Sequence, residues 1–158
     1  MKNLLIAFAA LASLGAAEAS LAQTTNSTDD TQLLISQIQT DKRAVVLRTM
    51  ELSDAEVAAF TPIYDEYQAE MKVIFQRGVD VLNKFAANYG SMTDAAAKDI
   101  LKEWFSVRDD RNAVLKKYAK KLEKKLPATD VLRWVQIENK LTALLDIQAA
   151  QVVPISTK

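Results

Sequence analysis

The stretch LSDAEVAAFTPIYDEYQAEMKVIFQRGVDVLNKFAANY, residues 52–89, decides the fold of this chain. Its apolar residues recur at alternating spacings of four and three, which is typical of a long amphipathic helix packed along a coiled-coil-like seam. Ser53 and Glu56 have the spacing of a capping box, and Leu52 precedes them as a hydrophobic staple would. The pattern therefore predicts one helix from Asp54 to about Tyr89.

Two residues interrupt this helical pattern. Pro62 lacks a backbone donor and its ring crowds the preceding turn, so a kink is expected there. Gly78 occupies a seam position, where it costs about 1 kcal/mol relative to alanine. Gly78 is either a notch that receives a large aromatic side chain of the next helix, Trp104 or Phe105, or a simple flexible point.

The rest of the chain reads as three further helices. The first runs from about Asp30 to Met50, and its inward side chains are expected to be Leu34, Ile38 and Val45, with Leu33 and Val46 as further candidates. The second runs over residues 94–126 and ends at a proline, and the third runs over residues 129–153. Glycine and proline are scarce, at three each, and no stretch shows strand-like alternation. The sequence predicts an all-α fold of four helices with a long antiparallel central hairpin.

The N-terminus has the features of an export signal. A short basic start is followed by an apolar stretch over residues 4–14 and by small residues up to Ala22. This apolar stretch is shorter than the ~20 residues that a membrane-spanning helix needs. We expect a signal peptide over residues 1–22, cleaved after Ala22 or, as a second choice, after Ala19, and a bacterial periplasm as the location.

The expected mature chain is one domain without a membrane span. Residues 23–30 are polar and aperiodic, which favours a disordered leader, and residues 31–153 form a single helical domain. Because long helices with few neighbours leave their seams uncovered, a homodimer is expected.

Composition excludes several classes of function. Lys and Arg together number 20, as do Asp and Glu, so the bulk charge argues against a nucleic-acid partner. The chain contains no His and no Cys, which removes disulfides and the usual ligands of zinc, copper and nickel. Asp109 and Asp110, or else Asp65, Glu66 and Glu70, could hold a hard cation weakly, but no loop resembles a calcium-binding one. The sequence predicts no enzyme, no cofactor, no catalytic residue and no metal site.

A basic face is expected on the helix over residues 94–126. The face is formed by Lys116, Lys117, Lys120, Lys121, Lys124 and Lys125. These six lysines could attract an acidic protein, lipopolysaccharide or anionic lipid headgroups. They could instead form a solvated face that suits the negative end of the helix dipole. They could also set the register of the hairpin, because a turn centred near Met92 would place Asp65, Glu66 and Glu70 beside them. The nearby stretch 108–112 is expected to form ion pairs within and between helices, or else a polar centre on a concave surface.

Two short segments carry a family resemblance. Leu52-Ser53-Asp54-Ala55-Glu56 resembles the LTxxQ motif of the Spy/CpxP-like periplasmic proteins, with Ser for Thr and Glu for Gln. Leu126-Pro127-Ala128-Thr129-Asp130 stands where the second copy would lie, and it keeps the leucine and the break between helices. The resemblance implies a bent, cradle-like helical dimer that acts as an ATP-independent chaperone or as an accessory factor in envelope-stress signalling. Some relatives bind metal, and the absence of His argues against that branch.

The sequence and the resemblance together predict a non-enzymatic periplasmic protein that holds unfolded or envelope protein clients on a basic and apolar helical surface. The alternative is a dedicated binding or sensor partner of one envelope protein, and metal-linked sensing is the least favoured. The residues expected at the client- or partner-binding surface are Lys116, Lys117, Lys120, Lys121, Lys124, Lys125, Tyr67, Met71, Trp104 and Phe105.

Overall fold

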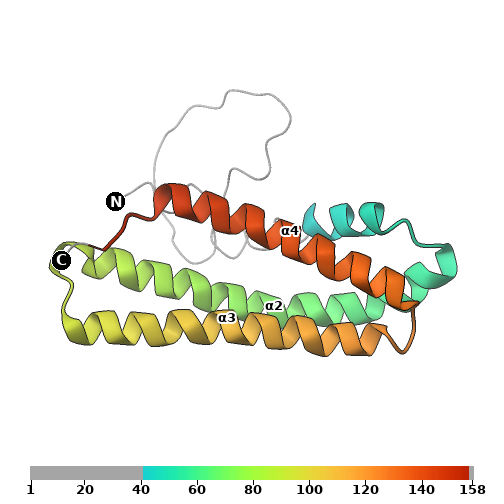
Figure 1. Cartoon of the computed structure of the whole chain (residues 1–158), viewed down its shortest axis with the longest axis horizontal. Helices are drawn as coiled ribbons and strands as arrows, with labels where there is room; N and C mark the ends of the chain where they lie inside the picture. Colours follow the sequence, from blue (N-terminus) through green and yellow to red (C-terminus); the bar gives the residue numbers. More distant parts are fainter. Residues whose placement is uncertain (1–40, 157–158) are drawn as a thin grey trace, which may run out of the picture.

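The computed structural model describes residues 41–156, and every regular element in that range is helical (Figure 1). A helical segment over residues 41–50 is followed by α2 (Asp54–Asn88), the short 3₁₀ turn η2 (Tyr89–Ser91), α3 (Asp94–Leu122) and α4 (Ala128–Val152). The predicted four helices and the long antiparallel pair of α2 and α3 are confirmed. The expected signal peptide, the expected polar leader and the first part of the predicted first helix lie outside the described residues.

The start of α2 follows from the capping box. Ser53 Oγ accepts a hydrogen bond from the backbone N–H of Glu56 at 3.4 Å, while Glu56 Oε2 accepts from the backbone N–H of Ser53 at 2.9 Å. Ser53 Oγ also donates to Glu56 Oε2 at 2.7 Å, and these bonds hold the pKa of Glu56 below its ordinary value. Just before the cap, Glu51 has a φ of 54°, the left-handed conformation that commonly ends a helix. The chain therefore reverses direction between the segment 41–50 and α2.

The two long helices are aligned by ion pairs along their common edge. Glu66 and Glu70 of α2 lie 2.6 and 2.5 Å from Lys121 and Lys117 of α3. Farther along, Arg77 lies 2.6 Å from Asp110, and Lys84 contacts both Asp99 and Glu103 at 2.7 Å. This register agrees with a hairpin turn near Met92, as the sequence predicts.

The third helix ends earlier than the sequence predicts. The last residue of α3 is Leu122, and residues 123–126 form a turn in which the N–H groups of Lys125 and Leu126 both bond to the carbonyl of Leu122, at 2.8 and 2.9 Å. Because Pro127 disfavours the helical conformation for the residue before it, the chain leaves the helix within this turn. The prediction of one six-lysine helical face is therefore wrong for Lys124 and Lys125, which lie in the turn.

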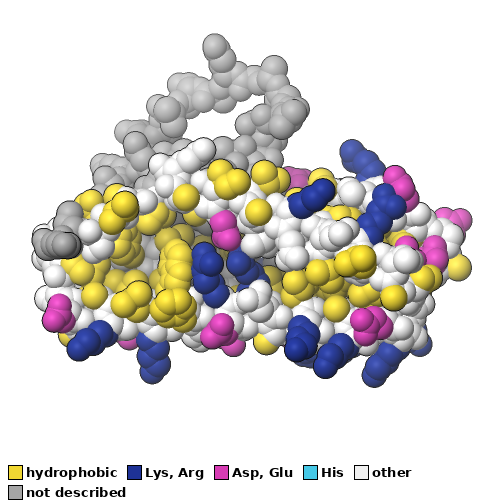
Figure 2. All heavy atoms as spheres, viewed as in Figure 1, with side chains coloured by type: hydrophobic (Ala, Val, Ile, Leu, Met, Phe, Trp, Pro, Cys, Tyr) yellow, Lys and Arg dark blue, Asp and Glu magenta, His cyan; other side chains and the backbone are white. Residues whose placement is uncertain are grey.

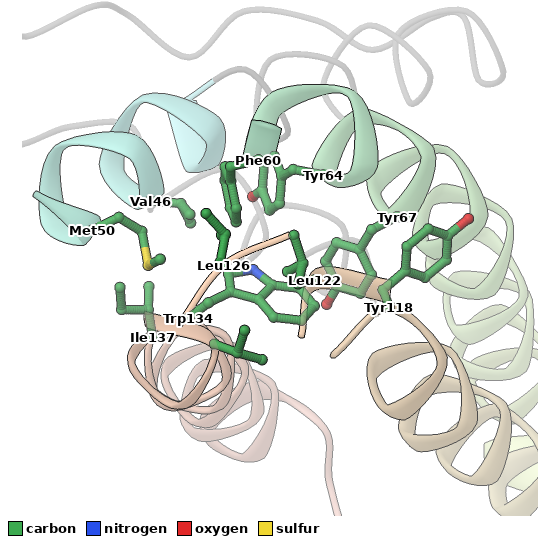
Figure 3. Close-up of a cluster of buried hydrophobic side chains, with 11 residues drawn as sticks. Val46, Met50, Phe60, Tyr64, Tyr67, Tyr118, Leu122, Leu126, Trp134 and Ile137 are labelled. Atoms are coloured by element: carbon green, nitrogen blue, oxygen red, sulfur yellow. The ribbon is translucent and has the colours of Figure 1, made fainter. Parts of the chain in front are cut away.

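The hydrophobic core lies at one end of the molecule, where all four helical elements meet (Figure 3). Trp134 of α4 is fully buried there, with its ring edge-on to Phe60 at 6.5 Å and to Tyr67 at 5.0 Å between centroids. Aromatic contacts of this kind add about 0.5–1.5 kcal/mol beyond the burial of area. The cluster comprises Val46, Met50, Phe60, Tyr64, Tyr67, Tyr118, Leu122, Leu126, Val131, Trp134 and Ile137.

Neither of the two interruptions predicted in α2 ends the helix. Pro62 lies inside α2, which continues through it as one helix. At Gly78, an added Cβ would lie 3.7 Å from Val107 Cγ1, an ordinary van der Waals distance. The prediction of a notch for Trp104 or Phe105 is wrong, because Val107 faces the glycine and the side chain of Phe105 is 60% exposed.

Candidate binding groove

A groove lies between α2, α3 and α4 and adjoins the hydrophobic core at Met71. It encloses about 140 Å³, and Figure 2 shows hydrophobic side chains along a hollow between α4 and α3, with basic side chains beside it. The floor is apolar and comes from the second half of α2, the middle of α3 and the last turns of α4. The principal lining residues are Met71, Ile74, Phe75, Trp104, Val107 and Leu145.

The charged residues at the groove are largely paired with one another. Arg111 Nη2 lies 3.8 Å from Asp146 Oδ2, which joins α3 to α4 across the groove. The guanidinium of Arg108 stacks over the ring of Trp104 at 5.4 Å from its centroid. Asp110 pairs instead with Arg77. The polar stretch 108–112 thus forms ion pairs between helices, one of the two interpretations open from the sequence.

The predicted apolar surface residues separate into three environments. Met71 and Trp104 line the groove. Phe105 is exposed on α3 and is not among the lining residues. Tyr67 is buried in the core, so its side chain does not contribute to a surface. The structure therefore brings together two of the four apolar residues that the sequence places at a client-binding surface.

The six lysines also separate into two groups. Lys117 and Lys121 pair with α2 carboxylates, and their ammonium groups lie 5.2 and 4.5 Å from the ring centroid of Tyr118. Among the described residues, no salt bridge involves the other four lysines, and all four are exposed. These are Lys116, Lys120, Lys124 and Lys125. None of the six lines the groove.

The contact between Glu70 and Tyr118 shifts both pKa values. Lys117 donates to Glu70 Oε1, and the Tyr118 hydroxyl donates to the same oxygen at 2.8 Å. These two bonds hold the pKa of Glu70 below its ordinary value. Burial, together with the bond to the Glu70 carboxylate, raises the pKa of Tyr118 to about 12. Lys117 is thus held against the hairpin by a shared carboxylate.

A buried carboxylate in the core was not predicted from the sequence. The side chain of Glu138 is only 2% exposed, and its Oε2 accepts from the Tyr67 hydroxyl at 2.7 Å and lies 2.7 Å from Lys42 Nζ. The Tyr64 hydroxyl donates to Oε1 at 3.4 Å. Burial and the Glu138 carboxylate raise the pKa of both tyrosines. The group joins the segment 41–50, α2 and α4, and its enclosure favours a structural role.

The sequence did contain a signal for this cluster. Glu138 follows Trp134 by four residues and Lys42 precedes Val46 by four, so each charged residue lies on the inward face of its helix. A carboxylate on one inward face and an ammonium on another indicate a buried ion pair, since unpaired buried charges are rare.

Within residues 41–156, no group of three or more His, Cys, Asp or Glu side chains is arranged to hold a metal ion. None of the helices described there is long and apolar enough to cross a membrane.

Comparison of the chain with protein-family models, with curated proteins and with solved structures found no match. The resemblance to the Spy/CpxP-like proteins therefore rests on the two short segments alone.

Proposed function

We propose that this protein is a non-enzymatic holding chaperone of the periplasm, of the Spy/CpxP type, which binds apolar segments of unfolded envelope proteins without nucleotide. The observation that supports the proposal most is the groove between α2, α3 and α4, because it offers an apolar floor at the surface. Exposed Leu101 and Phe105 extend the apolar surface along α3 beside Trp104. Lys116, Lys120, Lys124 and Lys125, which form no salt bridge among the described residues, provide the electrostatic attraction for a client.

The chemistry of the groove favours loose binding over tight recognition. Its lining includes methionine, leucine, isoleucine and valine side chains, and methionine adapts readily to different apolar shapes. Each apolar client side chain buried there contributes about 1.5–3 kcal/mol before the entropy of ordering is subtracted. A few such anchors give weak, exchangeable binding. This supports a holder of many clients over a dedicated partner of a single envelope protein.

The proposal includes a cradle-like homodimer, as the resemblance implies. Exposed apolar residues on α3 provide surface that a second copy would bury. Analytical ultracentrifugation of residues 23–158 should therefore give the mass of two chains at micromolar concentration. The mass of one chain would restrict the proposal to a monomeric holder.

An aggregation assay tests the chaperone function. Residues 23–158 are added at equimolar amounts to a reduced, unfolding client, without ATP and at two salt concentrations. We expect suppression of light scattering that weakens as salt rises, because exposed charges are screened. No suppression at either salt concentration would contradict the proposal and would leave the single-partner alternative, to be sought by a stoichiometric pull-down.

Two matched pairs of variants locate the surface. The double variant Lys116→Glu/Lys120→Glu changes lysines outside the salt bridges and should reduce suppression without lowering the melting temperature. Its control, Lys117→Glu/Lys121→Glu, breaks the hairpin ion pairs and should lower the melting temperature. In the groove, Trp104→Ser should reduce suppression, whereas Leu132→Ser, at an exposed position of α4 outside the groove lining, should not.

A further inference from the structure

The described helices form a four-helix bundle at one end of the molecule and a three-helix bundle at the other. At the core end, the segment 41–50 fills the corner between α2 and α4 (Figure 3). The segment is described only from residue 41, beside Glu138, whereas α2 and α4 continue to Asn88 and Val152. Beyond that point the groove opens, and two apolar side chains of α4, Leu144 and Ile147, are 50% and 56% exposed.

We propose that residues 31–38 of the same chain dock into this groove, as a continuation of the helical segment 41–50. These residues lie outside the described part of the chain, and the register of the segment 41–50, the lining of the groove and the sequence of residues 31–38 support the docking. The docking does not depend on the proposed function.

Three contacts fix the direction and register of the segment. Glu51 Oε2 lies 2.7 Å from Arg133 Nη2, and Lys42 Nζ lies 2.7 Å from Glu138 Oε2, so the segment runs antiparallel to α4. Arg43 Nε lies 3.1 Å from Asp65 Oδ1, which places the segment against α2 as well. Both neighbouring helices therefore continue past residue 41 in the direction in which the segment would extend.

The same register carries the preceding residues to the groove. Helices rise by about 1.5 Å per residue, so each residue back along the segment is matched by one residue forward on α2 and α4. Four residues before Lys42, Ile38 reaches the level of Met71. One turn farther, Leu34 reaches the level of Phe75 on α2 and Leu145 on α4. Met71, Phe75 and Leu145 all line the groove.

The sequence of this segment suits the site. Residues 31–40, TQLLISQIQT, contain no charged residue, and Leu34 and Ile38 continue the four-residue spacing of Lys42, Val46 and Met50. At the groove, Arg111 pairs with Asp146 and Arg108 stacks over the ring of Trp104, and a segment without charge leaves both contacts in place. An apolar stripe on a segment without charge is thus matched to the apolar floor of the groove.

An engineered disulfide tests the docking directly, because the natural chain contains no cysteine. In the mature protein, residues 23–158, Leu34→Cys/Leu145→Cys should form an intramolecular disulfide on mild oxidation. The control is Ser36→Cys/Leu145→Cys, since residue 36 lies about half a turn from the inward face. We expect the first pair to close at least about tenfold faster, because a disulfide needs close and well-directed Cβ atoms. Equal rates would overturn the proposal. Disulfide-linked dimers would also overturn it and would assign the groove to a second copy.

A second pair of variants keeps the test independent of cysteine chemistry. Ile38→Asp would place a charge on the docking face, and Gln39→Asp would place one beside it. We expect Ile38→Asp to lower the melting temperature and to shift the emission of Trp104 to the red, while the control leaves both unchanged. Identical behaviour of the two variants would contradict the docking.

One consequence rests on the proposed function: a client would compete with residues 31–38 for the groove. The aggregation assay with the Leu34→Cys/Leu145→Cys protein separates the two ideas. Weaker suppression by the oxidised than by the reduced form supports the competition. Equal suppression by both forms overturns the competition and leaves the chaperone function intact. Suppression by neither form removes the chaperone function, whereas the disulfide still reports the docking.

Discussion

The hydroxyl of Tyr67 and the ammonium of Lys42 meet the same carboxylate oxygen, Glu138 Oε2, each at 2.7 Å. The three residues come from α2, the segment 41–50 and α4, so this one oxygen connects three elements of the bundle. Lys42 also lies 5.5 Å from the centroid of the Tyr67 ring. A charge in this position is stabilising only while its partners remain in place.

Removing the buried carboxylate should strongly destabilise the protein. We expect Glu138→Ala to lower the free energy of unfolding by about 3–5 kcal/mol, because the ammonium and the hydroxyl groups lose their common partner. Glu138→Gln keeps an acceptor for the tyrosines and should have a smaller effect. Chemical denaturation followed by circular dichroism measures both. Glu123→Ala, at an exposed position, is the control and should change stability by less than about 0.5 kcal/mol. A similarly small effect of Glu138→Ala would contradict the structural role.

The tyrosines should make the protein sensitive to high pH. The pKa of Tyr118 is raised to about 12 from an ordinary value of 10.0, and those of Tyr64 and Tyr67 are raised as well. A group whose pKa is raised on folding stabilises the native state fully below its unfolded pKa and loses this contribution as pH rises through the folded pKa. We expect helicity to fall and tyrosinate absorbance to rise together between pH 10 and about 12.

The variant Tyr118→Phe tests how much Tyr118 contributes to the alkaline transition. It removes one ionisable group from the hairpin and should shift the alkaline transition upward in pH. Ionisation of Tyr64, Tyr67 and Tyr118 near pH 10 while helicity is unchanged would contradict the coupling between ionisation and unfolding.

The capping box of α2 should contribute to stability in a pH-dependent way. Ser53→Ala removes the hydroxyl that accepts from the Glu56 N–H, and we expect a loss of about 1 kcal/mol at neutral pH. Because the pKa of Glu56 is lowered in the folded state, the carboxylate contribution is present above the unfolded pKa of about 4.5 and is lost as pH falls through the folded value. The difference between Ser53→Ala and the natural protein should therefore shrink at acidic pH. Ser91→Ala, at an exposed position in η2, is the control.

Replacing the mid-helix glycine should stabilise the protein. The backbone at Gly78 is helical, and a new Cβ would make an ordinary contact with Val107. Since glycine is less favourable than alanine by about 0.8–1 kcal/mol inside a helix, Gly78→Ala should raise the free energy of unfolding by up to that amount. Thermal and urea denaturation report the change. A lower melting temperature would mean that α2 and α3 pack more closely at this point than the 3.7 Å contact indicates.

Local patterns predicted much of the helical layout. The capping box at Ser53 and the unbroken seam after it gave the bounds of α2 to within a residue or so, because both signals depend only on neighbours in the sequence. The hairpin register followed from the position of the turn, and it correctly placed Glu70 near the lysines of α3. The predicted end of α3 was wrong, because Lys125 and Leu126 before Pro127 both favour helix and give no local sign of the turn.

The finer arrangement of side chains depended on contacts between distant segments. In the segment 41–50, Val46 is fully buried and Val45 is 43% exposed, so the prediction that Val45 faces inward was wrong. Which of two adjacent valines is buried depends on the angle at which the helix meets α2 and α4. The groove likewise requires the position of α4 against the hairpin, for which the sequence has no local signal. Tyr67 was predicted at the binding surface, but its large aromatic side chain is buried in the hydrophobic core.

The ion pairs along the hairpin follow a definite order of charge. Going along α2 toward the turn, the residues facing α3 change once from acidic to basic, in the order Glu66, Glu70, Arg77 and Lys84. Their partners on α3 change in the opposite sense, in the order Lys121, Lys117, Asp110 and Asp99.

A slip of one heptad would set Glu70 against Asp110 in one direction, or Arg77 against Lys117 in the other. Each exposed pair is worth only about 0–1 kcal/mol, and in each direction the named pair replaces an attraction with a repulsion. The order of the charges thus disfavours these two shifted alignments of the hairpin. Two chains that exchanged their α3 arms would retain the same pairs only in the native alignment, so a domain-swapped dimer of this protein would preserve the register of the monomer.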